Sequence, residues 1–123
     1  MVNRGLLSIV DDDESIRESL PDLLRSFGFE VAAFSSAEEF LASGAPDRTG
    51  CLLLDVAMPG MSGPALQLEL VRRKMPIPIV FITSLSDEAV RSSVLALGAV
   101  AYLLKPFSEI ALLEAVNAAL AKS

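Results

Sequence analysis

The sequence predicts an α/β fold in which five helices cover both faces of a doubly wound, five-stranded parallel sheet. Short apolar runs alternate strictly with segments of helical periodicity, which is typical of parallel strands joined by right-handed helical crossovers. The runs themselves are almost continuously apolar, as expected for strands that are covered on both faces. The chain has 123 residues, of which 52% are hydrophobic, and we expect residues 1–123 to form a single compact domain.

Five apolar runs have the length and the β-branched content of strands. In chain order they are Leu6 to Val10, Glu30 to Phe34, Cys51 to Leu54, Ile77 to Ile82 and Val100 to Leu104. The stretch from Ser43 to Gly50 precedes the third run and contains two glycines and a proline, so we expect it to be a long loop.

The first two helices are marked by an apolar stripe and by a capping motif. The first is expected to carry its stripe from Ile16 to Phe27 and to end at Gly28, a residue suited to a left-handed helix terminus. Ser36 followed by Glu39 forms a capping-box pattern, which indicates the start of a short second helix.

The remaining helices are predicted from their start and stop signals. Ser62 with Pro64 opens the third helix, which is expected to run to about Lys74. The fourth covers roughly Asp87 to Leu97, and the fifth starts near Ser108. Strands and helices therefore alternate along the whole chain.

The composition excludes several classes of function. Ten basic and sixteen acidic residues give a formal net charge of −6, which is the wrong sign for direct nucleic-acid binding. The absence of histidine excludes Ser-His-Asp and Cys-His catalysis and histidine metal sites. Cys51 is the only cysteine and is expected to be a core residue in a reducing compartment. No apolar run approaches the roughly 18 residues that cross a membrane, so we expect a cytoplasmic protein.

Polar residues follow four of the predicted strands at the point where each strand ends. The first strand runs into Asp11 and Asp12, the third ends in Asp55, the fourth in Thr83, and the fifth runs into Lys105. The carboxyl ends of parallel strands share one edge of the sheet, and ligands bind there near the topological switch point. We therefore expect these side chains to converge on one cleft.

The carboxylates of this cleft favour a divalent cation. Two like charges about 4 Å apart repel by roughly 4 kcal/mol at an effective dielectric constant of about 20, and a third carboxylate adds to the repulsion. Oxygen ligands without histidine or thiolate favour Mg²⁺, Mn²⁺ or Ca²⁺, and a small site that keeps waters for an incoming phosphate favours Mg²⁺. We therefore predict Mg²⁺ as the cofactor.

Four segments resemble the receiver domains of two-component response regulators. They are Ile9 to Asp13, Leu54 to Gly63, Ile82 to Ser84 and Leu104 to Phe107. The match covers nearly the whole chain, and details such as Gly98 to Tyr102 are most similar to the FixJ-like branch. The resemblance implies a flavodoxin-like (CheY-like) sheet with strand order 2-1-3-4-5.

The resemblance also implies a phosphoacceptor and a metal site. Asp55 would be the nucleophile that takes a phosphoryl group from a phosphohistidine on a partner histidine kinase. Asp12, Asp55 and the main-chain carbonyl of Ala57 would hold Mg²⁺ directly, and Asp11 would act through water. The domain would assist its own phosphorylation and dephosphorylation without being an enzyme that acts on other substrates.

The same resemblance implies a switch. Lys105 and Thr83 would contact phosphoryl oxygens. As the Thr83 hydroxyl moves toward the phosphate, Tyr102 would turn inward and change the surface of the fourth helix, fifth strand and fifth helix. We expect homodimerisation through the fourth helix and the fifth strand on phosphorylation. We also expect a DNA-binding output domain after Ser123, in which case this domain would be the N-terminal part of a transcriptional regulator.

Two details follow from positions near the site. Ala57 and Leu85 lie two residues beyond Asp55 and Thr83 and have no hydrogen-bonding side chain for an attacking water, which predicts slow loss of the phosphoryl group. The resemblance further implies a cis peptide bond between Lys105 and Pro106.

Each proposed residue also has a simpler structural explanation. Asp11 and Asp13 could both cap the first helix, which is the better explanation for Asp13, whereas for Asp11 the site is favoured. Asp55 would in isolation be a turn residue. Thr83 could be an ordinary strand-end residue, and Lys105 could extend from the sheet edge into solvent. Tyr102 could equally be a core aromatic.

Two other functions are compatible with the fold. A pseudo-receiver would regulate its partners by binding alone, without phosphate, although the complete set of acidic, hydroxyl and lysine residues argues against it. A flavodoxin-like protein would bind flavin mononucleotide at the same edge. The acidic stretch from Asp11 to Glu14 would repel the phosphate of the flavin, so this function is disfavoured.

Overall fold

The computed structural model describes residues 5–122, which form a five-stranded parallel sheet with the order β2-β1-β3-β4-β5. The strands are β1 (Leu6–Val10), β2 (Glu30–Phe34), β3 (Thr49–Asp55), β4 (Ile79–Thr83) and β5 (Ala101–Leu104). The expected strand order is confirmed. β1 pairs with both β2 and β3, so the topological switch point lies between β1 and β3. The expected domain of residues 1–123 includes Met1 to Arg4 and Ser123, which lie outside the described residues.

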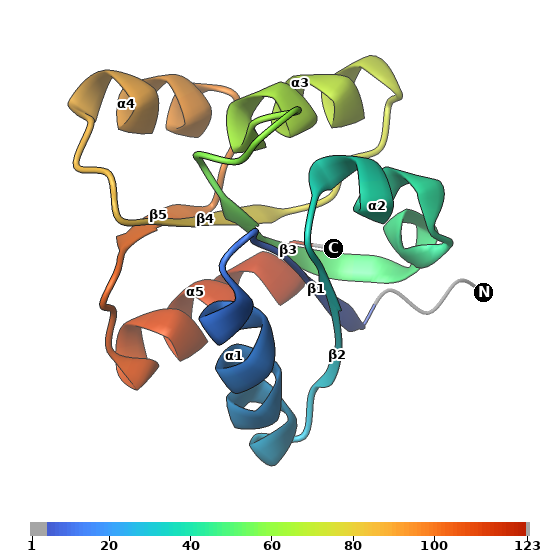
Figure 1. The fold of residues 1–123 in the computed structure, drawn as a ribbon, viewed down its shortest axis with the longest axis vertical. Coiled ribbons are helices and arrows are strands. Elements are labelled where there is room, and N and C mark those ends of the chain that lie inside the picture. The colour runs from blue at the N-terminus through green and yellow to red at the C-terminus, as the bar shows by residue number, and fades with distance from the viewer. Residues whose placement is uncertain (1–4, 123) are drawn as a thin grey trace.

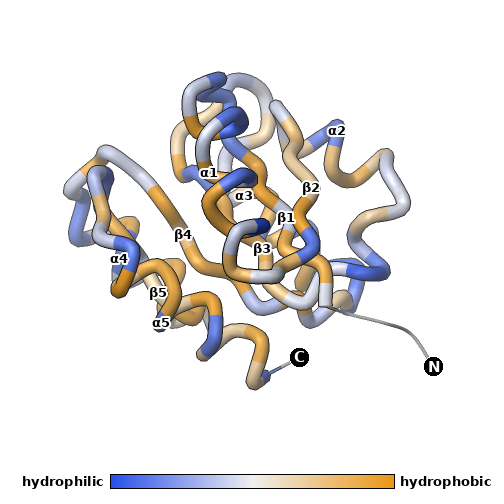
Figure 2. Tube along the Cα trace, turned by 90° about the horizontal axis from the view of Figure 1, so that it is seen from below, coloured by the Kyte–Doolittle hydropathy of each residue, from blue (hydrophilic) through white to orange (hydrophobic). Residues whose placement is uncertain are grey.

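Helices cover both faces of the sheet, as the alternating pattern predicts (Figure 1). On one face lie α1 (Glu14–Ser26) and α5 (Glu109–Leu120), and on the other lie α2 (Ala37–Ala42), α3 (Gly63–Arg72) and α4 (Glu88–Ala96). A separate apolar cluster fills each interface between helices and sheet. The hydropathy colouring of Figure 2 shows the hydrophobic residues concentrated along the strands.

Capping residues start the five α-helices where the sequence predicts them. In each helix the N-cap side chain accepts a hydrogen bond from a backbone N–H of the first turn; the caps are Asp13, Ser36, Ser62, Asp87 and Ser108. The capping box of α2 is incomplete, because the Glu39 carboxylate accepts from Ser35 and not from the Ser36 N–H. The first helix ends before Gly28, which has φ +92°.

The starts of three strands differ from the sequence expectations, and the smallest difference is in β5, which begins at Ala101 and not at Val100. The segment expected to be a loop contains a short 3₁₀ helix, η1 (Ala45–Arg48), and β3 begins at Thr49. The sequence did not indicate the start of β3 because Thr49 is polar. The Thr49 hydroxyl is nevertheless buried, where it hydrogen-bonds with the Ser8 hydroxyl and donates to the Ala45 carbonyl. β4 begins at Ile79 and not at Ile77, since Pro78 has no N–H to donate to a ladder.

The core is apolar with few exceptions. Cys51 is buried in β3, as expected, and burial raises the pKa of its thiol to about 12, which makes it unreactive.

Among the residues that the structure describes, no helix combines the length and the apolar character needed to cross a membrane.

Candidate functional site

The predicted site residues meet at the carboxyl edge of the sheet. Asp11 follows β1 directly, Asp55 and Thr83 are the last residues of β3 and β4, and Lys105 follows β5. Asp11, Asp55 and Thr83 are 0%, 7% and 1% exposed. The fifth member, Asp12, is exposed beside them. One carboxylate oxygen each of Asp11, Asp12 and Asp55 lies within 4.8 Å of the other two. We call these five residues the acidic site.

Backbone hydrogen bonds extend the sheet into the acidic site. The Asp11 N–H donates to the Phe34 carbonyl at 3.1 Å, and the Lys105 N–H donates to the Thr83 carbonyl at 2.8 Å. Both residues are therefore held by the strand ladders although they lie one position beyond their strands. The Lys105–Pro106 peptide bond is cis, as the resemblance implied.

Asp11 and Lys105 form a buried ion pair within the acidic site. The Lys105 Nζ lies 2.8 Å from Asp11 Oδ2, and the Lys105 side chain is only 18% exposed. The other carboxylate oxygen of Asp11 accepts from the Asp13 N–H at 2.9 Å, and Arg17 donates to the Asp11 carbonyl. Charge-assisted bonds of this kind fix the side chains, so Asp11 holds the ammonium group at the carboxyl edge of the sheet.

The arrangement disfavours the ionised form of Asp55. Burial raises the pKa of Asp55 most, the negative charge of Asp11 raises it further, and the opposing effect of Lys105 only partly compensates. Hydrogen bonding with Asp11 and the charge of Asp12 add to the rise, and the resulting pKa is about 7. A bound cation beside these oxygens would favour the ionised carboxylate.

Gly63 lets α3 begin very close to the main chain of Asp55. Gly63 begins α3, and its N–H donates to the Val56 carbonyl at 2.9 Å. A Cβ atom at this position would collide with the main-chain carbonyl oxygen of Asp55. Glycine is required here because the two main-chain segments approach each other closely. A single sequence does not reveal such a contact.

Glu38 holds the loop after β3 and was not identified from the sequence. Its Oε2 accepts from the Met61 N–H at 3.0 Å, across 23 positions of the chain. The same carboxylate lies against Gly60, where φ is +73°. Ala57, whose main-chain carbonyl is the expected metal ligand, lies in this loop. In the sequence, Glu38 has only the signature of an acidic residue in the first turn of a helix.

Thr83 and Tyr102 are connected through one residue of the loop after β4. The Thr83 hydroxyl oxygen accepts from the Leu85 N–H at 3.0 Å, and the Tyr102 hydroxyl donates to the Leu85 carbonyl at 3.0 Å. The Tyr102 ring lies 6.5 Å from the Phe81 ring, between their centroids. Leu85 therefore links the two residues that the sequence identified as a switch, a role with no signal in the sequence.

The residues present fit a hard divalent cation. Three carboxylates offer oxygen ligands at one point, and no nitrogen or sulfur ligand belongs to the group. Asp13, in contrast, caps α1 through a hydrogen bond from the Ser15 N–H at 2.9 Å, as expected from its position.

Comparison with known protein families gives a match over most of the chain. The model of the response regulator receiver domain matches residues 7–117. Nodulation protein W from Bradyrhizobium diazoefficiens is 48% identical over 116 residues, which are 94% of this chain and 51% of that protein. The transcriptional regulatory protein FixJ from Azorhizobium caulinodans is 40% identical over 115 residues, covering 94% of this chain and 54% of the relative. The chain thus spans about half the length of these curated relatives.

A solved structure agrees in fold. The crystal structure of FixJ-N superimposes with a TM-score of 0.88 at 36% sequence identity, covering 100% of this chain and 98% of that one.

The raised pKa of Asp55 predicts a pH-dependent stability. The folded-state pKa of about 7 lies above the ordinary value of 3.8, so the protonated group contributes stability that is full below about pH 4 and is lost as the pH rises through about 7. In metal-free protein, Asp55→Asn should therefore be about as stable as wild type at about pH 4 and more stable at about pH 8, by on the order of 2 kcal/mol. Thermal unfolding in the presence of EDTA measures the difference.

The control for this prediction is Asp22→Asn, the same chemical change at a side chain that is 84% exposed. Its effect should stay small across the pH range. A pH-independent difference between Asp55→Asn and wild type would contradict the electrostatic explanation.

Proposed function

The chain belongs to the response regulator receiver domain family, in its FixJ-like branch, and on this basis we propose that Asp55 is the phosphoacceptor of a two-component signalling switch. The observation that supports this role most directly is the convergence of Asp55 with two further carboxylates and Lys105 at the switch point of the sheet. The phosphoryl donor would be a phosphohistidine on a partner histidine kinase.

The proposed reaction is a displacement at phosphorus. A carboxylate oxygen of Asp55 forms the new P–O bond while the P–N bond of the phosphohistidine breaks, and the imidazole leaves with the bonding electron pair. Asp55 must be ionised to attack. Asp12, Asp55 and the main-chain carbonyl of Ala57 would hold Mg²⁺, with Asp11 acting through water. When bound, this ion would neutralise negative charge on the carboxylates and the phosphoryl oxygens.

Lys105 and Thr83 are proposed to bind the transferred group. Lys105 would direct its ammonium group at a phosphoryl oxygen while Asp11 keeps it in position. The Thr83 hydroxyl would turn to donate to a second phosphoryl oxygen, and the Leu85 N–H would then lose its acceptor. Because Leu85 also holds the Tyr102 hydroxyl, this change would free Tyr102 to move inward.

The output surface is proposed to lie on α4, β5 and α5. Large apolar side chains are exposed there: Leu97, Leu104 and Ile110 are 46%, 45% and 71% exposed. α4 fully buries only Val94, so a shift of this helix breaks few core contacts. We propose that phosphorylation promotes homodimerisation through this surface.

The wider function is proposed from the relatives. FixJ is named a transcriptional regulatory protein, and the relatives extend to about twice the matched length. A DNA-binding output domain joined to this one would receive the switched surface. The net charge of −6 is consistent with a domain that does not itself bind DNA.

An apolar groove beside Lys105 is proposed to receive the kinase. Its lining comes from α1 and from the segment after β5: Ile16, Ser19, Leu20, Leu23, Lys105, Pro106 and Phe107. Lys105 belongs to both the groove and the acidic site, so a helix seated in the groove would lie next to Asp55. An apolar helix face that presents a phosphohistidine matches this arrangement.

A small phosphodonor tests the phosphoacceptor. Acetyl phosphate with Mg²⁺ should add one phosphoryl group to the wild-type domain and none to Asp55→Asn, as measured by intact-protein mass spectrometry. Asp22→Asn is the matched control and should be modified normally. The group should be lost slowly, because Ala57 and Leu85 offer no side chain to orient a water. Absence of modification in the wild type would instead favour the phosphate-independent pseudo-receiver.

A charged residue in the groove should slow phosphorylation by the kinase without changing phosphorylation by acetyl phosphate. Ser19→Arg should slow phosphorylation by a histidine kinase that modifies the wild type, by roughly 10-fold or more, because it places a cation in an apolar contact. Phosphorylation by acetyl phosphate should not change. Ser92→Arg, the same substitution on exposed α4, serves as the control. Equal slowing with both donors would contradict a docking role.

Sizing tests the proposed dimer. The phosphorylated domain should double its mass in light scattering, whereas phosphorylated Leu104→Arg should remain monomeric, because an arginine would have to be desolvated in the interface. Leu68→Arg alters a leucine on α3 that is 55% exposed, compared with 45% for Leu104, and should still dimerise. A phosphorylated wild type of unchanged mass would reject this output.

A further inference from the structure

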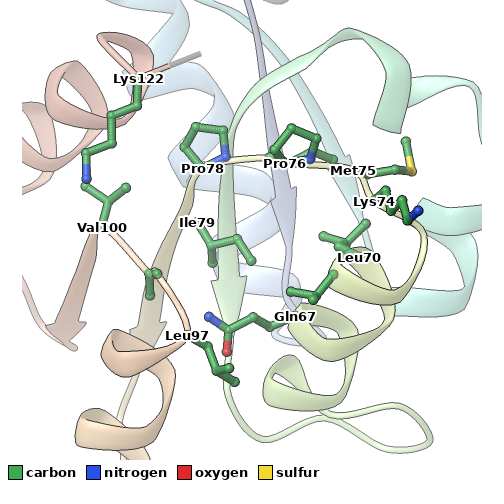
Figure 3. Close-up of a pocket in the computed structure, with 14 residues that line it drawn as sticks. Gln67, Leu70, Lys74, Met75, Pro76, Pro78, Ile79, Leu97, Val100 and Lys122 are labelled. Carbon is green, nitrogen blue, oxygen red and sulfur yellow. The ribbon is translucent and has the colours of Figure 1, made fainter.

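The loop of residues 56–62 leads from the acidic site into α3. The other end of α3 borders an apolar cavity of about 550 Å³ at the amino edge of the sheet, where Leu70 and Lys74 belong to the lining (Figure 3). The loop follows Asp55 directly and contains Ala57, whose main-chain carbonyl is the expected metal ligand. The conformation of the loop therefore decides where that carbonyl lies.

The core holds part of this loop. Val56 and Met58 are 6% and 9% exposed, and both belong to the apolar cluster on the α2, α3 and α4 side of the sheet. The Val56 carbonyl also accepts from the Gly63 N–H at 2.9 Å. Pro59 and Gly60, in contrast, are exposed. Core packing therefore does not fix the turn at these two residues.

Glu38 of α2 contacts this turn. The Met61 N–H donates to Glu38 Oε2 at 3.0 Å, across 23 positions of the chain. The same oxygen lies against Gly60, because a Cβ atom at that position would be only 2.7 Å from it. Gly60 also has φ +73°, a left-handed conformation that favours glycine. The turn is therefore folded closely around one carboxylate oxygen.

The helix that carries Glu38 is anchored in the core. Its neighbours Ala37 and Phe40 are both 0% exposed. The Phe40 ring packs edge-on against the ring of Phe34 in β2, with 5.5 Å between their centroids. A side chain that extends from a regular element positions its partner more precisely than a side chain on a loop does.

We propose that Glu38 is a positioning residue that raises the affinity of the acidic site for Mg²⁺. This role rests on the proposed function, in which Asp12, Asp55 and the Ala57 carbonyl hold the ion. When Glu38 holds the turn, the main chain that follows Ala57 is ordered before the ion binds, so binding costs less conformational entropy. Residues that orient metal ligands without touching the ion contribute to metal affinity in this way.

The test compares Glu38→Ala with the wild type on the chain described here. Calorimetric titration of Mg²⁺ into the metal-free domain should show an affinity roughly 10-fold lower in the variant. Phosphorylation by acetyl phosphate should need a correspondingly higher Mg²⁺ concentration to reach half of its maximal rate. The rate at saturating Mg²⁺ should be unchanged, because Glu38 contacts neither the reacting carboxylate nor Lys105.

A measurement without metal tests the contact itself. In metal-free Glu38→Ala, the backbone amide hydrogen of Met61 should exchange with solvent faster than in the wild type, since it has lost its acceptor. Exchange in the five strands should be the same in both proteins, which checks that the variant is folded.

Two variants separate the hydrogen bond from the charge of Glu38. Glu38→Gln keeps an oxygen that can accept from the Met61 N–H but removes the charge, so its Mg²⁺ affinity should stay close to that of the wild type. Glu39→Ala removes an acidic residue from the same turn of α2. Because Glu39 accepts from Ser35 and not from the loop, this variant should also bind Mg²⁺ as the wild type does.

Three results would overturn the proposal. One is a wild-type Mg²⁺ affinity in Glu38→Ala. Another is an equal loss of affinity in Glu38→Gln, which would assign the effect to charge, and the third is an equal loss in Glu39→Ala, which would assign it to the stability of α2. A wild-type domain that binds no Mg²⁺ and takes no phosphoryl group would instead refute the proposed function, whatever the variants do.

Discussion

The charge imbalance at the carboxyl edge of the sheet is the constraint on which the site depends. Asp11 and Asp55 are buried, Asp12 lies beside them, and the ammonium group of Lys105 lies 2.8 Å from Asp11. That ammonium pairs with Asp11, so the negative charge of Asp55 is left without a direct partner. Ionisation of Asp55 is therefore unfavourable in the fold, and a bound proton or cation reduces the cost. A cation bound beside these oxygens would lower this cost, because it would offset their negative charge.

Rigid neighbours keep this unfavourable arrangement from relaxing. The ladders of β1 and β5 continue through Asp11 and Lys105, so the main chain at neither residue can move away without breaking sheet hydrogen bonds. Gly63 lets the start of α3 approach the Asp55 carbonyl closely, and Glu38 ties down the loop that follows β3. Like charges stay close because strand ends and loop contacts over-determine their positions.

The sequence predicts the site better than it predicts the contacts inside it. Asp55, Thr83 and Lys105 could be placed together because strand ends share an edge, a property of topology that periodicity reveals. The pairing of Lys105 with Asp11 could not be predicted, since it depends on which of three nearby carboxylates the ammonium reaches. Thr49 was missed as the start of β3 because its burial rests on a hydrogen bond to Ser8, 41 positions away. Contacts of this range leave no local pattern in a single sequence.

The position of α4 explains how a local change at the acidic site could reach a surface. β4 is buried along its whole length and cannot move without disturbing both apolar clusters. α4 differs, because Val94 is its buried side chain, whereas α5 buries four residues. Its start is connected through the preceding loop to Leu85, which holds both Thr83 and Tyr102. Its far end is tied to α3 by the hydrogen bond from Gln67 to the Val94 carbonyl. With a stiff strand on one side and a weakly anchored helix on the other, the proposed rearrangement of Thr83 would displace α4 and not the sheet.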